Sequence, residues 1–178
     1  NSQRQFMNLN APPKTLSTAD MPIPTCATCH MSGLEGMKFT HDVTERLSYW
    51  LFAAVSEKRP GYEQGKIEMQ EVCLKCHTKP HVDEFYTNAG AVVVSTNDKV
   101  KEAQDLMAEL RSEGLLTPEP FDEHIEFLYF DYWHYFGRTA KHGAYMGGAD
   151  FVQWHGNYEL LLMMTEMKEI AEELRKRQ

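Results

Sequence analysis

A short motif of two cysteines and a histidine occurs twice, and it constrains this chain more than any other feature. The first copy is CATCH at residues 26–30, and the second is CLKCH at residues 73–77. All 4 cysteines lie in these copies, so none is left for a long-range disulfide. Thiols three positions apart can form thioethers with the two vinyl groups of one porphyrin, while the next imidazole reaches the iron. The spacing therefore predicts two covalently bound c-type haems.

Two other uses of paired cysteines fit less well. Four thiolates could hold zinc, but zinc does not need a histidine directly after each pair. A thioredoxin-type dithiol needs one pair beside a βαβ pattern, which this chain lacks. The predicted haem-binding residues are Cys26, Cys29, His30, Cys73, Cys76 and His77. Of these, the two histidines are the proximal iron ligands.

The chain has more histidines than two haems require as iron ligands. The chain has 8, and six remain once the motif histidines are assigned. Each of these six histidines, considered alone, can be explained equally well as a surface histidine or a hydrogen-bonded one. Together they indicate imidazoles that bind haems attached elsewhere. As candidate ligands we rank His41, His142 and His155 first, His81 second, and His124 and His134 last. His81 follows the second motif by four residues and would have to serve a different haem.

Composition excludes several classes of protein. With 42% hydrophobic and 25% charged residues, the 178-residue chain is typical of a folded domain. A net charge of −8 without a basic stripe argues against binding to nucleic acid. The longest aliphatic run, Leu160 to Met164, is too short to cross a bilayer. The first 25 residues show no secretory signal pattern.

Hydrophobic periodicity predicts helix almost throughout. One helix is expected from Asp42, capped with Glu45, to the Pro60-Gly61 stop. A second carries Val100, Ala103, Met107 and Leu110 and ends at Gly114. The apolar run 91–94 is ambiguous between strand and helix, and its context favours helix.

Two further helices are expected towards the end of the sequence. Residues 121–135 carry two apolar stripes, one through Ile125 and Leu128 and one through Phe127 and Phe130, so both faces need a cover. Residues 157–178 form a long amphipathic helix. The core methionines are predicted to be Met107, Met164 and Met167. The fold class is therefore all-α, with helices packed around haems and a long C-terminal helix.

The segment between these two helices, residues 137–156, is predicted to be irregular because it is rich in glycine. Its aromatic and imidazole side chains suggest a functional loop that approaches a flat cofactor. The alternative is a surface loop whose Tyr and Trp side chains only pack inward.

The two haem motifs together with KHGAYMGGADFVQWHGNY at residues 141–158 resemble the C-terminal part of the octahaem hydroxylamine oxidoreductase family. The resemblance implies a homotrimer, a close-packed array of haems with mostly two histidine ligands each, and a catalytic haem cross-linked to a tyrosine of a neighbouring subunit. The matching catalytic tyrosine would be Tyr145, with Tyr158 as the second candidate. The two local haems would serve electron transfer.

Only two of the family's motifs are present, so residues 1–178 are expected to be one C-terminal haem-binding domain of a larger enzyme or of a split chain. The resemblance implies oxidation of hydroxylamine to nitric oxide or nitrite, with a soluble or membrane-associated cytochrome as electron acceptor. The alternatives are hydrazine oxidation, reduction of nitrite or hydroxylamine, and a non-catalytic electron carrier. A reductive relative would lack the cross-linking tyrosine. Because thioether attachment takes place outside the bacterial cytoplasmic membrane, we expect a periplasmic protein.

Overall fold

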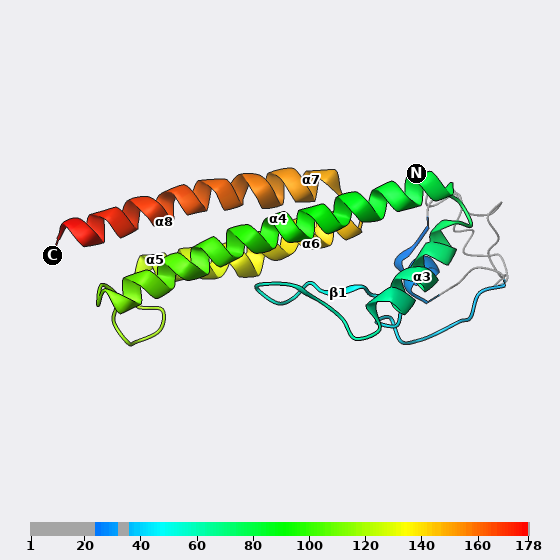
Figure 1. The fold of residues 1–178 in the computed structure, drawn as a ribbon, viewed down its shortest axis with the longest axis horizontal. Helices are drawn as coiled ribbons and strands as arrows, with labels where there is room; N and C mark the ends of the chain where they lie inside the picture. Colours follow the sequence, from blue (N-terminus) through cyan, green and yellow to red (C-terminus); the bar gives the residue numbers. More distant parts are fainter. Residues whose placement is uncertain (1–23, 32–35, 178) are drawn as a thin grey trace, which may run out of the picture. The chain divides into compact units, whose positions relative to one another are not determined.

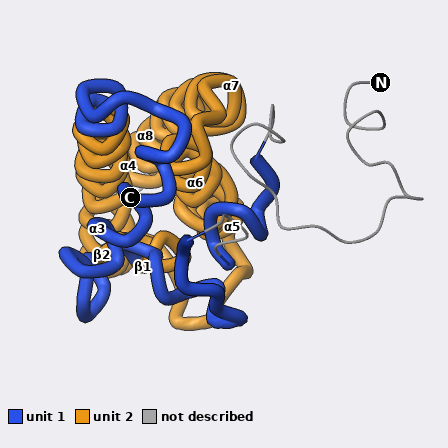
Figure 2. The backbone as a smooth tube through the Cα atoms, turned by 90° about the vertical axis from the view of Figure 1, so that its right-hand side faces the viewer, with its two compact units in different colours: residues 1–49, 58–84 blue, residues 50–57, 85–178 orange. Residues whose placement is uncertain are grey.

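The computed structural model describes residues 24–31 and 36–177, so the expectation drawn from the start of the chain falls almost entirely outside them. The described chain is helical apart from a two-stranded sheet, which confirms the predicted all-α class. It divides into two compact units (Figure 2). Unit 1 consists of residues 1–49 and 58–84, and unit 2 of residues 50–57 and 85–178.

Unit 1 contains short elements. They are α2 (Cys26–His30), α3 (Tyr62–Cys73) and the first turns of α4 (Lys79–Ser112). A loop runs so close to α3 that a Cβ atom added at Gly65 would lie 3.1 Å from the carbonyl oxygens of Glu45 and Leu47. The buried apolar side chains among the described residues of this unit are Val72 and Val82. Unit 1 therefore has little apolar core of its own.

The helix expected from Asp42 to Pro60 is absent, and this prediction was wrong. The segment forms turns and a small sheet of β1 (Tyr49–Trp50) and β2 (Glu57–Lys58). The Asp42 carboxylate accepts hydrogen bonds from the amide and hydroxyl of Thr44, at 2.9 and 2.7 Å, and so closes a turn instead of capping a helix. Val43, within this segment, is exposed.

Unit 2 is built from three helical segments that run alongside one another (Figures 1 and 2). The segments are α4 beyond Glu84, the run of α5 (His124–Phe130), η2 (Asp131–Gly137) and α6 (Arg138–Tyr145), and the run of α7 (Ala149–Val152), η3 (Gln153–Asn157) and α8 (Tyr158–Lys176). The elements η2 and η3 are π-helical. Such turns are rare and frequently occur at functional sites.

The core of unit 2 lies along these three segments. Its fully buried members include Val100, Met107, Leu110, Ile125, Tyr132, Leu160 and Met167. The predicted stripe on α4 is confirmed, as are its end at Gly114, where φ is +71°, and the helical state of residues 91–94. The three predicted core methionines and the C-terminal helix are also confirmed.

The two-stripe prediction for residues 121–135 holds in part. The first stripe is buried at Ile125, Leu128 and Tyr132 but exposed at its last member, Tyr135, and Phe127 of the second stripe is exposed. The second stripe therefore has no complete cover among the residues that the structure describes. None of the described helices is both long and apolar enough to cross a membrane.

The segment 137–156 is helical instead of irregular, so this prediction was wrong. Its glycines allow close packing: a Cβ atom at Gly156 would lie 2.6 Å from Ala140 Cβ, and one at Gly143 would lie 2.8 Å from Phe151 Cβ. Within this segment only Gly147 has a positive φ, +66°, at the turn between α6 and α7. Glycine here serves the approach of one helix to another.

Candidate haem sites

The first CxxCH motif is a single helical turn. The Thr25 side chain accepts a hydrogen bond from the Thr28 amide at 3.3 Å, and the Thr28 hydroxyl accepts one from the Thr25 amide at 3.2 Å. This capping box starts α2 directly before Cys26. Cys29 and His30 are half-buried. The turn therefore presents both thiols and the imidazole from one short, fixed segment.

The second motif begins where α3 ends. Cys73 is the last residue of α3, and its carbonyl accepts hydrogen bonds from the amides of Cys76 and His77, at 3.1 and 2.9 Å. The chain thus makes one more turn through the motif. His77 is exposed, and its ring stacks on that of His81 with 4.7 Å between centroids. Since these rings lie side by side, His81 is poorly placed to reach the other face of the same haem.

The thiols fit haem attachment better than zinc. None of the 4 forms a disulfide, and burial, together with the neighbouring thiols of both motifs, raises the pKa of Cys29 and of Cys73. In the part of the chain that the structure describes, three potential metal ligands with their ligand atoms within 4.8 Å of one another occur at Asp122, Glu123 and Glu126. This group consists of carboxylates and contains no thiol. The thiols are therefore not gathered as a tetrahedral zinc site requires.

The His30 imidazole is suited to iron ligation. Burial lowers its pKa, and the Val43 backbone opposes this effect while the Arg46 charge reinforces it. A lowered pKa favours the neutral ring, which is the form that binds a metal. Its Nδ1 atom is buried without a hydrogen-bond partner. The residues present in unit 1 thus fit a covalently bound haem.

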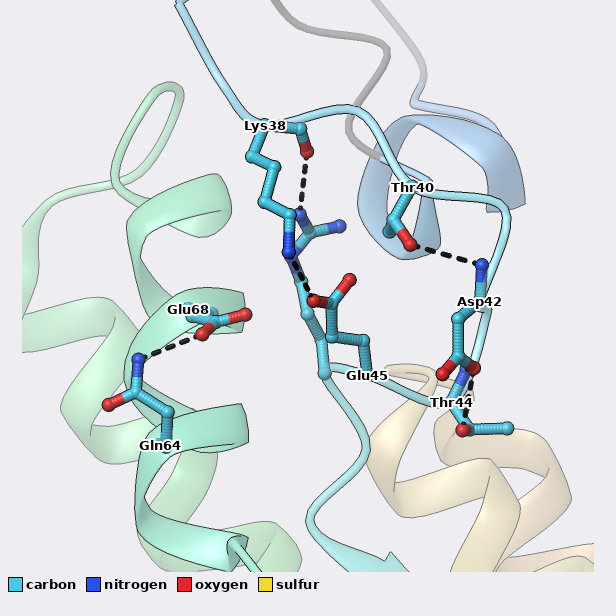
Figure 3. Close-up of polar contacts among 8 residues, drawn as sticks. Lys38, Thr40, Asp42, Thr44, Glu45, Gln64 and Glu68 are labelled. Atoms are coloured by element: carbon cyan, nitrogen blue, oxygen red, sulfur yellow. Dashed lines mark hydrogen bonds and ion pairs between the residues drawn. The ribbon is translucent and has the colours of Figure 1, made fainter.

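A polar loop lies beside the first motif (Figure 3). The Lys38 ammonium pairs with the Glu45 carboxylate at 2.6 Å, next to the turn closed by Asp42. Arg46, which follows in the chain, is only 3% exposed and donates hydrogen bonds to the carbonyl oxygens of Cys29, at 3.3 Å, and Lys38, at 3.1 Å. These bonds tie the loop to the haem-attachment turn.

Unit 2 carries a groove of about 720 Å³ lined mainly by apolar side chains and two imidazoles. Its walls include Phe52, His134, Arg138, His142, Met146 and Phe151. The Arg138 guanidinium lies 4.8 Å from the centre of the Phe52 ring, and the His142 ring lies 5.0 Å from it. Lys141 holds the loop that carries Phe52, donating to the carbonyl oxygens of Ala53 and Ala54 at 3.1 and 3.0 Å.

The two imidazoles of the groove differ in availability. Nδ1 of His142 lies 2.8 Å from the Arg138 carbonyl, which only accepts, so Nδ1 carries the proton and Nε2 keeps its lone pair. Nε2 of His134 lies 2.8 Å from Nη1 of Arg138, which only donates, so this lone pair is used. The geometry therefore favours His142 over His134 as a metal ligand, in line with the predicted ranking.

The remaining predicted ligands are dispersed. His41 is exposed in unit 1 against the Phe39 ring, while His124 and His155 are exposed in unit 2. His155 lies in η3 with its ring 5.3 Å from that of Phe151. These imidazoles stay predictions, because nothing in the described residues brings them together.

The two candidate tyrosines have different surroundings. Tyr145 ends α6, and its half-buried ring lies 6.5 and 6.1 Å from those of Phe85 and Tyr86. Tyr158 begins α8, is 53% exposed and lies 5.9 Å from the Trp154 ring. A tyrosine that bonds to a haem of a neighbouring subunit must be accessible at the surface of its own subunit. Tyr158 is more accessible than Tyr145.

Several site residues were missed from the sequence, namely Phe52, Arg46, Arg138 and Lys141. For Arg138 a signal existed, because His134, Arg138 and His142 follow one another at four-residue spacing and share a helix face. Reading the segment as a loop hid this signal. The burial of Arg46 and of Lys141 has no local signal, since both depend on contacts with distant parts of the chain.

Comparison with known proteins identifies the family. A family model described as "Seven times multi-haem cytochrome CxxCH" matches residues 2–122. A solved "Hypothetical multiheme protein" shares the fold with a TM-score of 0.83 at 19% identity, over 92% of this chain and 47% of that one. The "Kuenenia stuttgartiensis reducing HAO-like protein complex Kustc0457/Kustc0458" gives a TM-score of 0.80 at 16% identity, over 98% and 50%.

The chain thus spans about half the length of each of these solved chains. No curated protein matches it significantly. The family model covers more than half of the sequence and includes both cysteine motifs. The chain therefore belongs to the CxxCH multihaem cytochrome family and binds haem c covalently.

Proposed function

We propose that this chain is the C-terminal haem-carrying part of a multihaem oxidoreductase that oxidises hydroxylamine to nitric oxide or nitrite. The observation that carries the proposal is the pair of complete haem-attachment turns in unit 1, combined with an available imidazole in the groove of unit 2. Bound haem c supplies one-electron redox chemistry, so the two motifs would serve electron transfer.

The chain's own residues would act mainly by binding the haems and by excluding water from them. His30 and His77 are the proximal ligands, and His142 offers Nε2 to a haem attached elsewhere. Phe52 and Phe151 would cover such a group from water, because they line the same groove. Arg138 fixes the His142 tautomer through its backbone carbonyl, as outer-shell partners commonly do at metal sites.

Conversion of hydroxylamine to nitric oxide releases three electrons and three protons, so an external acceptor is required. A soluble or membrane-associated cytochrome in the periplasm would take the electrons.

An exposed apolar stripe on α7, η3 and α8 supports a homotrimer, because contact with a neighbouring subunit would remove this apolar surface from water. The stripe consists of Phe151, Trp154, Tyr158, Leu161 and Leu162, each more than half exposed.

The tyrosine proposed for the catalytic haem of a neighbouring subunit is Tyr145, with Tyr158 as the competitor. The two are separated by comparing Tyr145→Phe with Tyr158→Phe in the assembled protein, each variant serving as the control for the other. The expected result is that one variant keeps both local haems by mass and loses the distinct optical spectrum of the catalytic haem. If both spectra match the wild type, neither tyrosine forms the cross-link.

The reaction itself is tested on the intact assembly. Hydroxylamine added to the oxidised protein should reduce the haems, and hydrazine should do so more slowly. If neither compound reduces the haems while dithionite does, the proposed oxidation is wrong.

One observation favours a second candidate, reduction of nitrite or hydroxylamine. One of the similar solved structures is described as a reducing protein complex. In that case nitrite should reoxidise the dithionite-reduced protein, and hydroxylamine should not reduce the oxidised one. A protein that responds to neither compound would be an electron carrier.

A further inference from the structure

Arg46 is a buried cation that forms no ion pair with any residue that the structure describes. Its side chain is only 3% exposed, and its two hydrogen bonds go to the neutral carbonyl oxygens of Cys29 and Lys38. Its Nε atom is buried without a partner. The neighbouring Glu45 carboxylate forms its ion pair with Lys38 and interacts with the Arg46 charge only at longer range. A buried guanidinium with only neutral partners is costly to keep, so its position calls for an explanation.

The charge lies at the first haem-attachment turn. Arg46 donates a hydrogen bond to the backbone carbonyl of Cys29, the residue directly before the proximal ligand His30. It also lines a groove of about 550 Å³ in unit 1, together with the cations Lys38 and Lys75 and the carboxylates Glu68 and Glu71. Because water is largely excluded from the guanidinium, its field there is weakly screened.

The second motif has a different setting. His77 and Cys76 are exposed, and Arg46, although it lines a groove with Lys75 of this motif, donates its hydrogen bond to the backbone of Cys29 in the first motif. Reduction of a haem iron removes one positive charge, so a nearby fixed cation favours the reduced state. Burial favours the reduced state as well, because it disfavours the more highly charged form. Both effects act in the same direction at the first motif and are weaker at the second.

We propose that Arg46 is a positioning and redox-tuning residue, which raises the reduction potential of the haem bound at Cys26–His30 above that of the haem bound at Cys73–His77. The inference rests on covalent haem binding and holds for either direction of the proposed reaction. When the two local haems share a single electron, that electron then resides mainly on the haem at His30.

The test is a spectroelectrochemical titration of the haem-loaded protein. Arg46→Gln should lower the higher of the two local midpoint potentials and leave the lower one unchanged, while Arg46→Lys should retain most of the wild-type value. Arg175→Gln is the matched control: it removes the same charge from a surface ion pair with Glu113 in unit 2 and should shift neither potential. Mass spectrometry confirms that both haems stay attached.

A second experiment tests the proposal without requiring the Arg46 variants to fold. Glu45→Gln removes the carboxylate nearest to Arg46 in sequence and should raise the same midpoint potential. Removing the second haem with Cys73→Ser and Cys76→Ser assigns the remaining potential to the first motif. If Arg46→Gln shifts neither potential, or shifts only the lower one, the proposal is overturned; an unchanged potential in Glu45→Gln also counts against it.

Discussion

Unit 1 and unit 2 bury different kinds of side chain. The described part of unit 1 buries Val72 and Val82 together with the polar residues Thr28, Arg46 and Ser48. Unit 2 buries a continuous apolar core along three helical segments, from Val100 to Ala171. Both are compact, but only unit 2 has enough apolar contact to account for its own stability.

The difference indicates what each unit needs in order to fold. In unit 1 the cysteine motifs lie on short turns with few apolar neighbours, so two covalently attached porphyrins would supply the missing apolar surface. In unit 2 the side chains themselves fill the interior. Cofactor loss and core mutation should therefore damage different parts of the same chain.

Removal of haem attachment should have the largest effect. Serine at Cys26, Cys29, Cys73 and Cys76 in the full chain should leave unit 1 unfolded, while unit 2 keeps its helices. Hydrogen exchange measures this, with the haem-loaded wild type as control. Amides of α3 should lose protection, and those of α8 should keep it. Protection of α3 equal to that of the wild type would contradict a haem-dependent unit 1.

A core truncation should show the reverse pattern. Leu160 is fully buried in unit 2, and Leu160→Ala should lower the free energy of unfolding by about 2–5 kcal/mol. The matched control is Val94→Ala in α4, whose side chain is 57% exposed and which should lower the free energy by less than about 0.5 kcal/mol. Denaturation is followed by circular dichroism, and the haem spectrum should change only at higher denaturant. Equal effects of the two variants would refute the assigned core.

The same contrast explains which features the sequence could predict. The haem motifs depend on residues within five positions, and the stripe of Val100, Met107 and Leu110 depends on helical periodicity. Both are local and both are confirmed. The expected helix at Asp42 failed because the side chain of Asp42 bonds to Thr44, a local competitor that a hydrophobic pattern does not reveal.

Features that depend on distant contacts were not predictable. Gly143 and Gly156 suggested a loop, but their small size is used where helices touch. Arg46 and Lys141 are charged residues that a sequence places at the surface, yet both are buried against backbone carbonyl oxygens. Burial lowers the pKa of Lys141 to about 8, a value that only the folded contacts explain.

The close contact at Gly156 gives a sharper test of packing in unit 2. In Gly156→Ala the new methyl group would lie 2.9 Å from Ala140 Cα and from the Phe151 carbonyl oxygen, so backbone must move. The expected loss in the free energy of unfolding is about 1–3 kcal/mol. Gly90→Ala in α4 is the matched control, since nothing lies within 4 Å of its added Cβ, and it should stabilise unit 2 by up to about 1 kcal/mol. If Gly156→Ala is as stable as the wild type, α6 and η3 do not pack this closely.

The smallest expected effect concerns a polar contact at the edge of the same core. Glu126 is buried; burial alone would raise its pKa, but the Arg111 guanidinium, 2.9 Å away, and backbone amides outweigh burial and lower it. A pKa that is lower in the folded than in the unfolded state stabilises the protein above the unfolded value, and this contribution disappears as the pH falls through the folded value.

Glu126→Gln should therefore cost roughly 1 kcal/mol in the free energy of unfolding at pH 7, since Arg111 is more than half exposed and the ion pair is partly screened. The cost should shrink as the pH falls below the ordinary glutamate range, where the wild-type carboxylate also becomes neutral. Urea denaturation at a series of pH values measures both quantities. Glu172→Gln, on the exposed face of α8 beside Lys176, is the control and should show little change at any pH. A cost that is independent of pH would mean that shape and packing, not the charge of Glu126, stabilise this edge of unit 2.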